Sequence, residues 1–222
     1  MASRPALSTP NKIAIGLLLA AVLAVIAIVV TANIRSTANQ TALAGTAQIV
    51  RPDSHRLSTA TNEKAVLVEF LDFECESCLA AKPFIEDLSV KYGNELTIVT
   101  RYFPLPGHPN SVTAALAVEA AAQQGEFESM YHRMFDTQTD WSHNEESQAD
   151  TFRGYAEELG LDMVAYDAAI ADPATADRIE KDKNDGIGLG VSGTPTFFLD
   201  GELIEPATLE EFEQLVADAV SK

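Results

Sequence analysis

The sequence has few cysteines, few basic residues and few histidines, and each shortage excludes a class of protein. Its 222 residues include two cysteines, which excludes a small scaffold held by several disulfides and a zinc site with four cysteine ligands. There are 15 Lys and Arg against 33 Asp and Glu, a formal net charge of −18. Because polyphosphate binding needs a basic surface, we expect no nucleic-acid partner. The four histidines lack the spacing of a metal-binding motif, so we expect no metal ligands.

One long apolar run without charge lies near the N-terminus, at residues 13–32 (IAIGLLLAAVLAVIAIVVTA). As a helix it spans about 30 Å, the thickness of a bilayer core. Arg4 and Lys12 precede it, which predicts a cytoplasmic N-terminus at residues 1–12. We predict an uncleaved transmembrane anchor, with a cleaved signal peptide and a buried core helix as alternatives. Under the first two interpretations the following residues lie outside the cytoplasm, the first of them at the cell membrane.

The remainder divides into a predicted linker and one predicted domain. Residues 33–48 are rich in Ala, Thr and Asn without a strong period, which is typical of a linker. Residues 49–222 are expected to form the domain, and residues 48–50 are predicted to form a short edge strand at its start. Residues 65–71 predict a buried central strand, and residues 96–103 predict a second strand. A helix between them, ending before Gly93, implies a parallel crossover.

The second half of the chain predicts a block of helices followed by a hairpin. Between about 110 and 190, apolar side chains recur at helical spacing, most clearly from Phe127 to Phe135. We interpret these stripes as core packing, with a cofactor pocket as the alternative. Asp200-Gly201 between two apolar runs predicts a hairpin, and Thr208 begins a capping box for the last helix. The fold class is therefore α/β with a helical insertion.

Both cysteines lie in one motif, Cys75-Glu76-Ser77-Cys78, where the central strand meets its helix. Residues i and i+3 at a helix N-terminus face the same side, so the two sulfurs can bond. The helix N-terminus stabilises a thiolate on the first cysteine, and the second can resolve a mixed disulfide. We predict a redox-active pair. A static disulfide and half of a shared metal site remain alternatives.

The residues around this motif resemble a known family. The segment VLVEFLDFECESC resembles the active-site strand and helix start of the thioredoxin superfamily. The segments FPLPGHPNSVTAALAVEAAAQQG and VSGTPTFFLDG resemble later parts of its DsbA-like branch, which includes membrane-tethered oxidoreductases of Gram-positive bacteria. The likeness extends from about residue 49 to residue 222. It implies a thioredoxin-like fold that carries a helical insertion.

The resemblance implies a role for several residues. Cys75 matches the attacking cysteine and Cys78 the resolving one, while Thr194 and Pro195 match the cis-proline loop that binds substrate backbone. Glu69 matches a buried acid that accepts a proton beneath the resolving cysteine. The alternatives are that Pro195 starts an edge strand and that Glu69 lies on an exposed strand face. We interpret His108 as a loop residue packed at a domain junction. The alternative is that its side chain approaches the cysteine motif.

The motif departs from the family pattern in one respect. Oxidising members often carry Pro or His between the cysteines, whereas this chain has Glu76 and Ser77, with Glu74 before the motif. Negative charges near Cys75 oppose its thiolate. We therefore predict a higher Cys75 pKa and a less oxidising couple than a motif with histidine gives.

These observations together predict a membrane-anchored, extracytoplasmic thiol–disulfide oxidoreductase that introduces disulfides into exported proteins with cysteines. No metal or organic cofactor is needed for this chemistry. A separate membrane redox partner is expected, because two cysteines cannot supply their own relay. The alternatives are a reductase or isomerase, and a tethered binding or chaperone module whose CxxC is passive.

Overall fold

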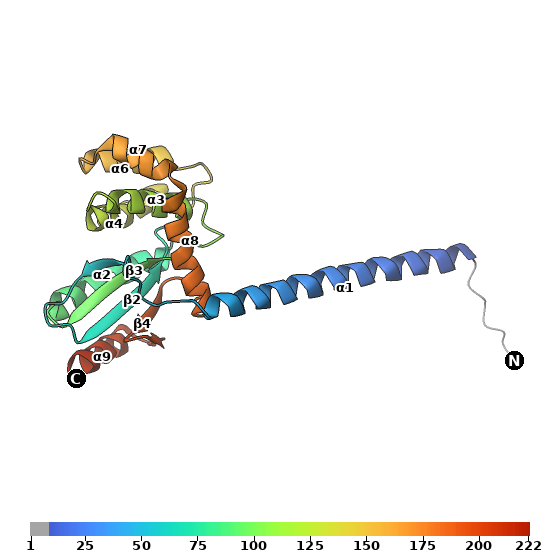
Figure 1. Ribbon diagram of the computed structural model, residues 1–222, viewed down its shortest axis with the longest axis horizontal. Coiled ribbons are helices and arrows are strands. Elements are labelled where there is room, and N and C mark those ends of the chain that lie inside the picture. The colour runs from blue at the N-terminus through green and yellow to red at the C-terminus, as the bar shows by residue number, and fades with distance from the viewer. Residues whose placement is uncertain (1–8) are drawn as a thin grey trace.

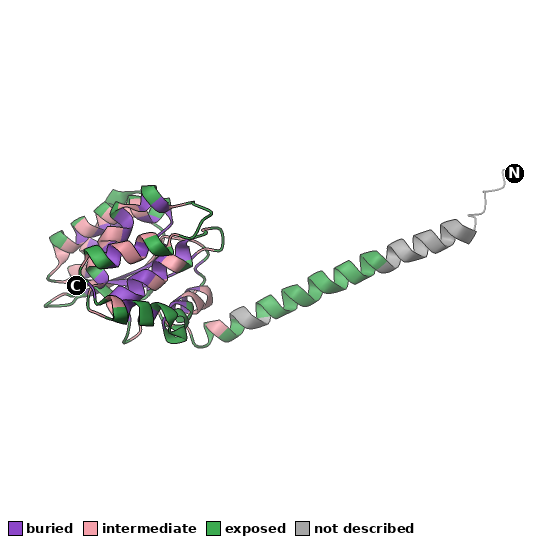
Figure 2. Ribbon diagram, turned by 90° about the horizontal axis from the view of Figure 1, so that it is seen from above, coloured by how far each residue is buried: buried purple, intermediate pink, exposed green. Residues whose placement is uncertain are grey.

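The computed structural model describes the backbone of residues 9–222, with the side chains of residues 21–37 and 41–222. A long helix, α1 (Thr9–Ala44), projects from a folded domain (Figure 1). This helix contains the predicted anchor, residues 13–32. The predicted cytoplasmic segment is residues 1–12, of which residues 1–8 lie outside the described residues. Within α1, Ala21–Ala44 is long and apolar enough to cross a membrane. Its large apolar side chains from Val22 to Ile34 are exposed (Figure 2), so the helix fits a membrane tether.

The segment predicted as a linker, residues 33–48, differs from that expectation in conformation. It continues α1 as far as Ala44. Residues 33–44 contain no glycine or proline, and lengthening a helix that already exists costs little free energy. The Thr37 and Thr41 hydroxyls also donate to carbonyl oxygens one turn earlier, at 3.0 and 2.9 Å. The domain is therefore joined to the apolar segment by a helical stalk.

The domain contains a five-stranded sheet in the order β1-β3-β2-β4-β5. The central strands β2 and β3 are parallel, as predicted, and the other pairs are antiparallel. The bounds of the strands are β1 (His55–Ser58), β2 (Ala65–Leu71), β3 (Leu96–Tyr102), β4 (Thr196–Leu199) and β5 (Glu202–Ile204). Residues 48–50 form no strand, so that expectation is wrong. Their carbonyl groups are used otherwise, since Gln48 and Ile49 accept hydrogen bonds from Arg101.

Helices cover both faces of the sheet. The helix that carries the cysteines, α2 (Glu76–Tyr92), and the C-terminal helix, α9 (Leu209–Val220), pack Ile85 and Phe212 against Leu67 and Ile98 on one face. On the other face, Phe70 and Val99 belong to a second core, which the helix α8 (Pro173–Gly188) helps to cover. The central strand is buried on both sides, which explains its nearly continuous apolar sequence.

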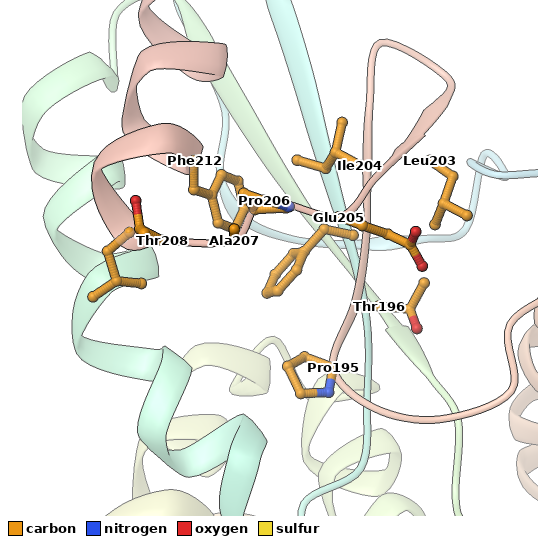
Figure 3. Close-up of a pocket in the computed structure, with 11 residues that line it drawn as sticks. Pro195, Thr196, Leu203, Ile204, Glu205, Pro206, Ala207, Thr208 and Phe212 are labelled. Carbon is orange, nitrogen blue, oxygen red and sulfur yellow. The ribbon is translucent and has the colours of Figure 1, made fainter.

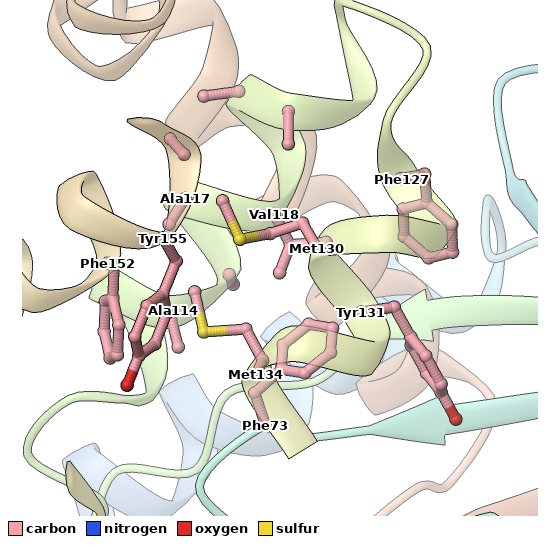
Figure 4. Packing of buried hydrophobic residues seen from close by; sticks show 14 of the residues in the cluster. Phe73, Ala114, Ala117, Val118, Phe127, Met130, Tyr131, Met134, Phe152 and Tyr155 are labelled. Carbon is pink, nitrogen blue, oxygen red and sulfur yellow. The ribbon is translucent and has the colours of Figure 1, made fainter. Parts of the chain in front are cut away.

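The predicted helical insertion lies between β3 and β4 and ends with α8. Its first helices form a separate bundle above the sheet (Figure 1). Alanines of α3 pack against Met130 and Met134 of α4, and Phe73, which follows β2, completes this core (Figure 4). The predicted stripes are thus core packing. The bounds are α3 (Ser111–Ala122), α4 (Phe127–Asp136), α5 (Gln138–Trp141), α6 (Ala149–Glu158) and α7 (Met163–Ala171).

A buried arginine joins the sheet, the insertion and the end of the stalk. Arg101 of β3 is fully buried, and it donates to Asp182 Oδ1 at 2.8 Å and Asp185 Oδ2 at 2.6 Å, both on α8. Asp185 also pairs with Arg51, beyond the stalk. A Cβ on Gly188 of α8 would lie 2.8 Å from the Leu43 carbonyl carbon and oxygen, so the glycine permits the close approach of α1. The stalk is therefore packed onto the domain.

The C-terminal hairpin and helix form as predicted. Asp200 and Gly201 join β4 to β5 with φ of 50° and 89°, the two positive values that a tight hairpin turn requires. The Thr208 hydroxyl accepts a hydrogen bond from the Glu211 amide at 3.1 Å and caps α9. This arrangement places the loop before β4 beside the start of α2.

Candidate active site

The two cysteines occupy the N-terminus of α2, directly after the central strand. Cys75 is the N-cap residue, and its carbonyl oxygen accepts hydrogen bonds from the amides of Cys78 and Leu79, both at 3.1 Å. Both cysteines are free thiols, with 6% of Cys75 and 1% of Cys78 exposed. An incoming sulfur atom therefore reaches Cys75 more readily than Cys78.

The surroundings separate the two thiols in acidity. The pKa of Cys75 is lowered to about 5, first by a hydrogen bond from the Cys78 side chain, against the opposing effect of burial. The side chain of Thr194 and the amides of Ser77 and Cys78 lower it further. The pKa of Cys78 is raised well above its usual value, mainly by burial and next by Cys75. At neutral pH the site therefore favours one thiolate, on Cys75, and one thiol, on Cys78.

The cis-proline loop faces Cys75 from the other end of the domain sequence. The Thr194–Pro195 peptide bond is cis, in agreement with the resemblance. Cys75 Sγ lies 3.4 Å from the Thr194 carbonyl oxygen, across 119 residues of sequence. The Thr194 hydroxyl is buried and has no hydrogen-bond partner among the described residues, so it is available to a thiolate on Cys75. The fold thus brings together three of the residues that the sequence singled out.

Glu69 lies in β2, on the same face of the sheet as Leu67 and Leu71, beneath α2. Only 2% of it is exposed, so the alternative of an exposed strand face is wrong. Burial, with the nearby Cys75 charge, raises the pKa of Glu69 to about 8. Its Oε2 accepts no hydrogen bond from any described group. Glu69 is thus a carboxyl group that is largely protonated at neutral pH, beside a buried thiol.

The helical insertion fixes the backbone around the CxxC motif. Gln138 of α5 is buried, and its side-chain amide donates to the carbonyl oxygens of Phe73 at 2.7 Å and Cys75 at 3.0 Å. Glu74 is also buried, and its two oxygens accept the backbone amides of Asn110 at 2.6 Å and His143 at 2.7 Å. The Glu74 charge is thus satisfied by the insertion, which weakens the expectation that it opposes the Cys75 thiolate.

Two histidines lie beside the motif. His143 Nε2 is 2.6 Å from Glu76 Oε1, and His108 Nδ1 is 2.7 Å from Asp72 Oδ2. The two rings meet edge to face with centroids 5.7 Å apart. His108 is thus packed at the junction of sheet and insertion, as interpreted, and the structure also brings it near the site. Among the residues whose side chains are described, no group of three or more His, Cys, Asp or Glu is arranged to hold a metal ion.

An apolar groove adjoins the cis-proline loop. It has a volume of about 490 Å³ and extends from Pro195 along β4 and β5 to α9. Figure 3 shows Pro195 at one end, with Ile204 and Phe212 further along. Leu203 and Leu209 contribute exposed apolar surface to the same groove. A groove of this size and polarity suits an extended peptide segment.

Sequence reasoning did not find three residues of this site: Asp72, Gln138 and His143. Asp72 accepts a hydrogen bond from the Leu105 amide at 2.9 Å, and Gln138 and His143 come from the insertion. Asp72 lies three residues before Cys75, which is a weak local signal. The other two have no sequence signal, because their function depends on how the insertion packs against the loop.

A sheet of this order, with a CxxC at a helix N-terminus and a cis-proline opposite, defines a protein of the thioredoxin-fold class. A family model described as thioredoxin matches residues 59–218. The chain therefore belongs to the thioredoxin family.

Solved structures of several oxidoreductases share this fold. A thioredoxin-like oxidoreductase from Silicibacter pomeroyi is 25% identical, with a TM-score of 0.65 over 78% of this chain and 95% of that one. The alpha-DsbA1 protein of Wolbachia pipientis is 20% identical, with a TM-score of 0.65 over 78% and 94%. BdbD from Bacillus subtilis is 17% identical, with a TM-score of 0.66 over 79% and 97%. The resemblance to DsbA-like proteins is thus confirmed at the level of the fold.

The curated proteins that this chain matches in sequence are longer than the chain itself. The chain is 36% identical over 152 residues to the Na(+)/H(+) antiporter NhaA of Herminiimonas arsenicoxydans, covering 68% of this chain and 23% of that protein. It is likewise 36% identical over 157 residues to an antiporter NhaA 1 of Mycolicibacterium vanbaalenii, covering 68% and 24%. The chain thus spans about a quarter of the length of the curated relatives that it matches.

Proposed function

We propose that this protein is a membrane-anchored thiol–disulfide oxidoreductase that introduces disulfides into exported proteins through Cys75 and Cys78. The observation that carries the proposal is the position of Cys75 at the N-terminus of α2, 3.4 Å from the carbonyl oxygen of Thr194 before the cis-proline, with Cys78 buried behind it. This setting separates the two thiols in acidity, with the pKa of Cys75 lowered to about 5 and that of Cys78 raised. A couple whose dithiol form is stabilised as a thiolate is a strong oxidant. The oxidoreductases of similar fold support the same class of reaction.

The reaction begins from the Cys75–Cys78 disulfide. A substrate thiolate attacks Cys75 Sγ, the Cys75–Cys78 bond breaks, and a mixed disulfide forms between substrate and Cys75. Cys78 leaves as a thiolate and takes up a proton, because its pKa is high. A second substrate thiolate then attacks the substrate sulfur of the mixed disulfide, and Cys75 departs as a stable thiolate. The substrate loses two electrons, and the CxxC pair gains them.

Glu69 is the proton donor and acceptor for Cys78 in this scheme. Its carboxyl is buried on the face of β2 beneath α2, and its pKa of about 8 suits proton exchange at neutral pH. When Cys78 is displaced as a thiolate, Glu69 donates its proton. When the pair is reoxidised, Cys78 must lose its proton again, and the Glu69 carboxylate accepts it.

The cis-proline loop and the adjoining groove bind the substrate. Thr194 and Pro195 lie against Cys75, and the groove runs from Pro195 toward α9. An extended peptide that enters the groove places a cysteine at Cys75 without needing a particular sequence. That property suits an enzyme that acts on many exported proteins.

The apolar helix supports the proposed location. The apolar part of α1, with basic residues before it in the sequence, favours a cytoplasmic N-terminus and an extracytoplasmic domain at the cell membrane. Disulfides form and persist in that compartment. Reoxidation then requires a membrane redox partner, because the chain has no further cysteine.

A glutathione equilibrium separates this function from the alternatives. The full-length protein in detergent micelles is equilibrated with glutathione buffers, and oxidation of a reduced model protein is followed. A reduction potential of about −120 to −180 mV with fast oxidation supports the proposal, whereas about −270 mV indicates a reductase. Exchange that persists in Cys75→Ser, or no exchange in the wild type, indicates a passive binding module.

A further inference from the structure

The dipeptide between the cysteines is acidic, yet its carboxylate has a partner that the sequence does not reveal. Glu76 lies in the first turn of α2, next to Cys75, and its Oε1 is 2.6 Å from His143 Nε2. His143 comes from the helical insertion, 67 residues further along the chain. About half of the His143 side chain and two thirds of Glu76 are exposed, so the pair lies at the rim of the site.

The position of His143 is set by its backbone rather than by its ring. Its amide donates to the buried Glu74 Oε1 at 2.7 Å, and its φ is 57°, in the left-handed region. Glu74 is held in turn by the Asn110 amide at 2.6 Å. We therefore expect the loop to keep its shape when the imidazole is replaced, because the hydrogen bonds of Glu74 to the His143 and Asn110 amides hold its backbone.

The titratable groups around the pair come from three loops: the one after β2, the one before α3 and the one after α5. Asp72, after β2, pairs with His108, whose ring contacts that of His143, and Glu74 faces the His143 backbone. The pKa of Glu76 is lowered, first by its own backbone amide and next by His143. Glu76 is thus ionised beside Cys75, where an uncompensated carboxylate would oppose the thiolate.

We propose that His143 is a positioning residue of the CxxC site, which acts through Glu76. Its imidazole holds the Glu76 carboxylate and, when protonated, offsets the negative charge next to Cys75. This favours the Cys75 thiolate, stabilises the dithiol form and makes the couple more oxidising. The insertion thereby neutralises the carboxylate that the dipeptide Glu76-Ser77 places beside Cys75. The inference rests on the proposed redox function of the pair.

The test is His143→Asn in the full-length protein in detergent micelles. Asparagine tolerates the left-handed backbone and cannot become a cation. We expect a roughly threefold lower thiolate-to-thiol ratio on Cys75, which raises its apparent pKa by about 0.5. The glutathione equilibrium shifts by about the same factor toward a more reducing couple, or about 14 mV for two electrons.

Two comparisons show whether the effect runs through Glu76. His132→Asn removes another half-exposed histidine that pairs with a carboxylate of α2, Glu86, about three turns from Cys75. We expect it to change neither quantity. In a Glu76→Gln background, His143→Asn is expected to have almost no effect on the Cys75 pKa, because the charge that it offsets is gone.

Three results would overturn the inference. These are an unchanged Cys75 pKa and potential in His143→Asn, an equal shift in His132→Asn, and an undiminished effect in the Glu76→Gln background. Failure of the proposed function has a different signature, since the wild type itself would then fail to exchange with glutathione. If the wild type exchanges and His143→Asn behaves like it, only the role of His143 is refuted.

Discussion

The sheet and the helical insertion contribute different things to one site. The sheet, with α2 and the loop before β4, carries the cysteines, Glu69 and the cis-proline. The insertion carries Gln138, Asn110 and His143, which bond to the backbone or to carboxylates of the CxxC loop. Its core is built from alanines, methionines and aromatics, and that of the sheet from Leu, Ile, Val and Phe.

This difference separates the reacting atoms from their setting. The groups that we propose to exchange electrons and protons belong to the half of the domain that is common to the fold. The groups that orient the loop and offset its charges belong to the insertion. Among groups of the first kind, removing a cysteine should abolish the reaction. Removing one of the second kind should change stability, acidity or potential by graded amounts.

The largest effect is expected from the cysteines themselves. Cys75→Ser removes the attacked sulfur, so thiol–disulfide exchange should fall to the background rate. Cys78→Ser leaves Cys75 able to form a mixed disulfide that nothing resolves. Mass spectrometry of the full-length protein after incubation with oxidised glutathione should show a stable adduct on Cys78→Ser and none on Cys75→Ser. An adduct on both variants would contradict the assignment.

Arg101 of the sheet is bonded to α8 of the insertion, so its substitution should lower the free energy of unfolding. Arg101→Met leaves the buried Asp182 and Asp185 without their shared cation and costs about 3–5 kcal/mol. Thermal unfolding should show a much lower midpoint. Arg56→Met, at an exposed arginine of β1, should stay within about 0.5 kcal/mol of the wild type. If both variants lost the same free energy of unfolding, the buried ion pairs of Arg101 would not stabilise the fold.

Glu69 should make stability depend on pH in a defined direction. Its pKa is about 8 in the folded reduced protein and about 4.3 in an unfolded chain, so folding binds a proton between these values. Wild-type stability should therefore fall as pH rises through this range, while Glu69→Gln lacks this loss. The variant should be more stable by on the order of 3 kcal/mol at pH 7, and by almost nothing near pH 4.

Denaturant titrations of the reduced protein at several pH values measure this difference. Glu202→Gln, at an exposed acid of β5, serves as the control and should show no such trend. A constant difference between Glu69→Gln and the wild type at every pH would show that Glu69 is ionised normally in the folded state.

The smallest effect is expected from Gln138. Gln138→Leu keeps the volume but leaves the buried carbonyls of Phe73 and Cys75 without this donor, which costs about 1–2 kcal/mol. The loop should also loosen, so that Cys75 is alkylated faster by iodoacetamide. Gln214→Leu, on the exposed face of α9, should alter neither property. If Gln138→Leu alkylates like the wild type, the insertion does not hold the loop.

Local patterns predicted the elements of the fold well. The central strand was readable because both of its faces are buried, and the Asp200-Gly201 turn because its backbone angles demand those residues. The edge strand at 48–50 was wrong because three β-favouring residues do not show that their carbonyls bond to a distant Arg101. The stalk was not anticipated because residues 33–44 lack a strong apolar period while still permitting a helix.

The candidate site was also predictable only in part from the sequence. The roles of Cys75, Pro195 and Glu69 came from a motif and a family resemblance, and the structure brings these residues together. The contributions of Gln138 and His143 were not predictable, because each depends on how an insertion folds against a loop more than 60 residues away. Single glutamines and histidines carry no spacing signal of their own.

The most direct test of the account is the acidity of Cys75. The ultraviolet absorbance of the thiolate is titrated in the reduced full-length protein, with Cys75→Ser as the blank. The account predicts one transition near pH 5 that is absent from Cys75→Ser, because hydrogen bonds from Cys78 and Thr194 stabilise the thiolate. A single transition near the ordinary cysteine value of about 8.5 would contradict it.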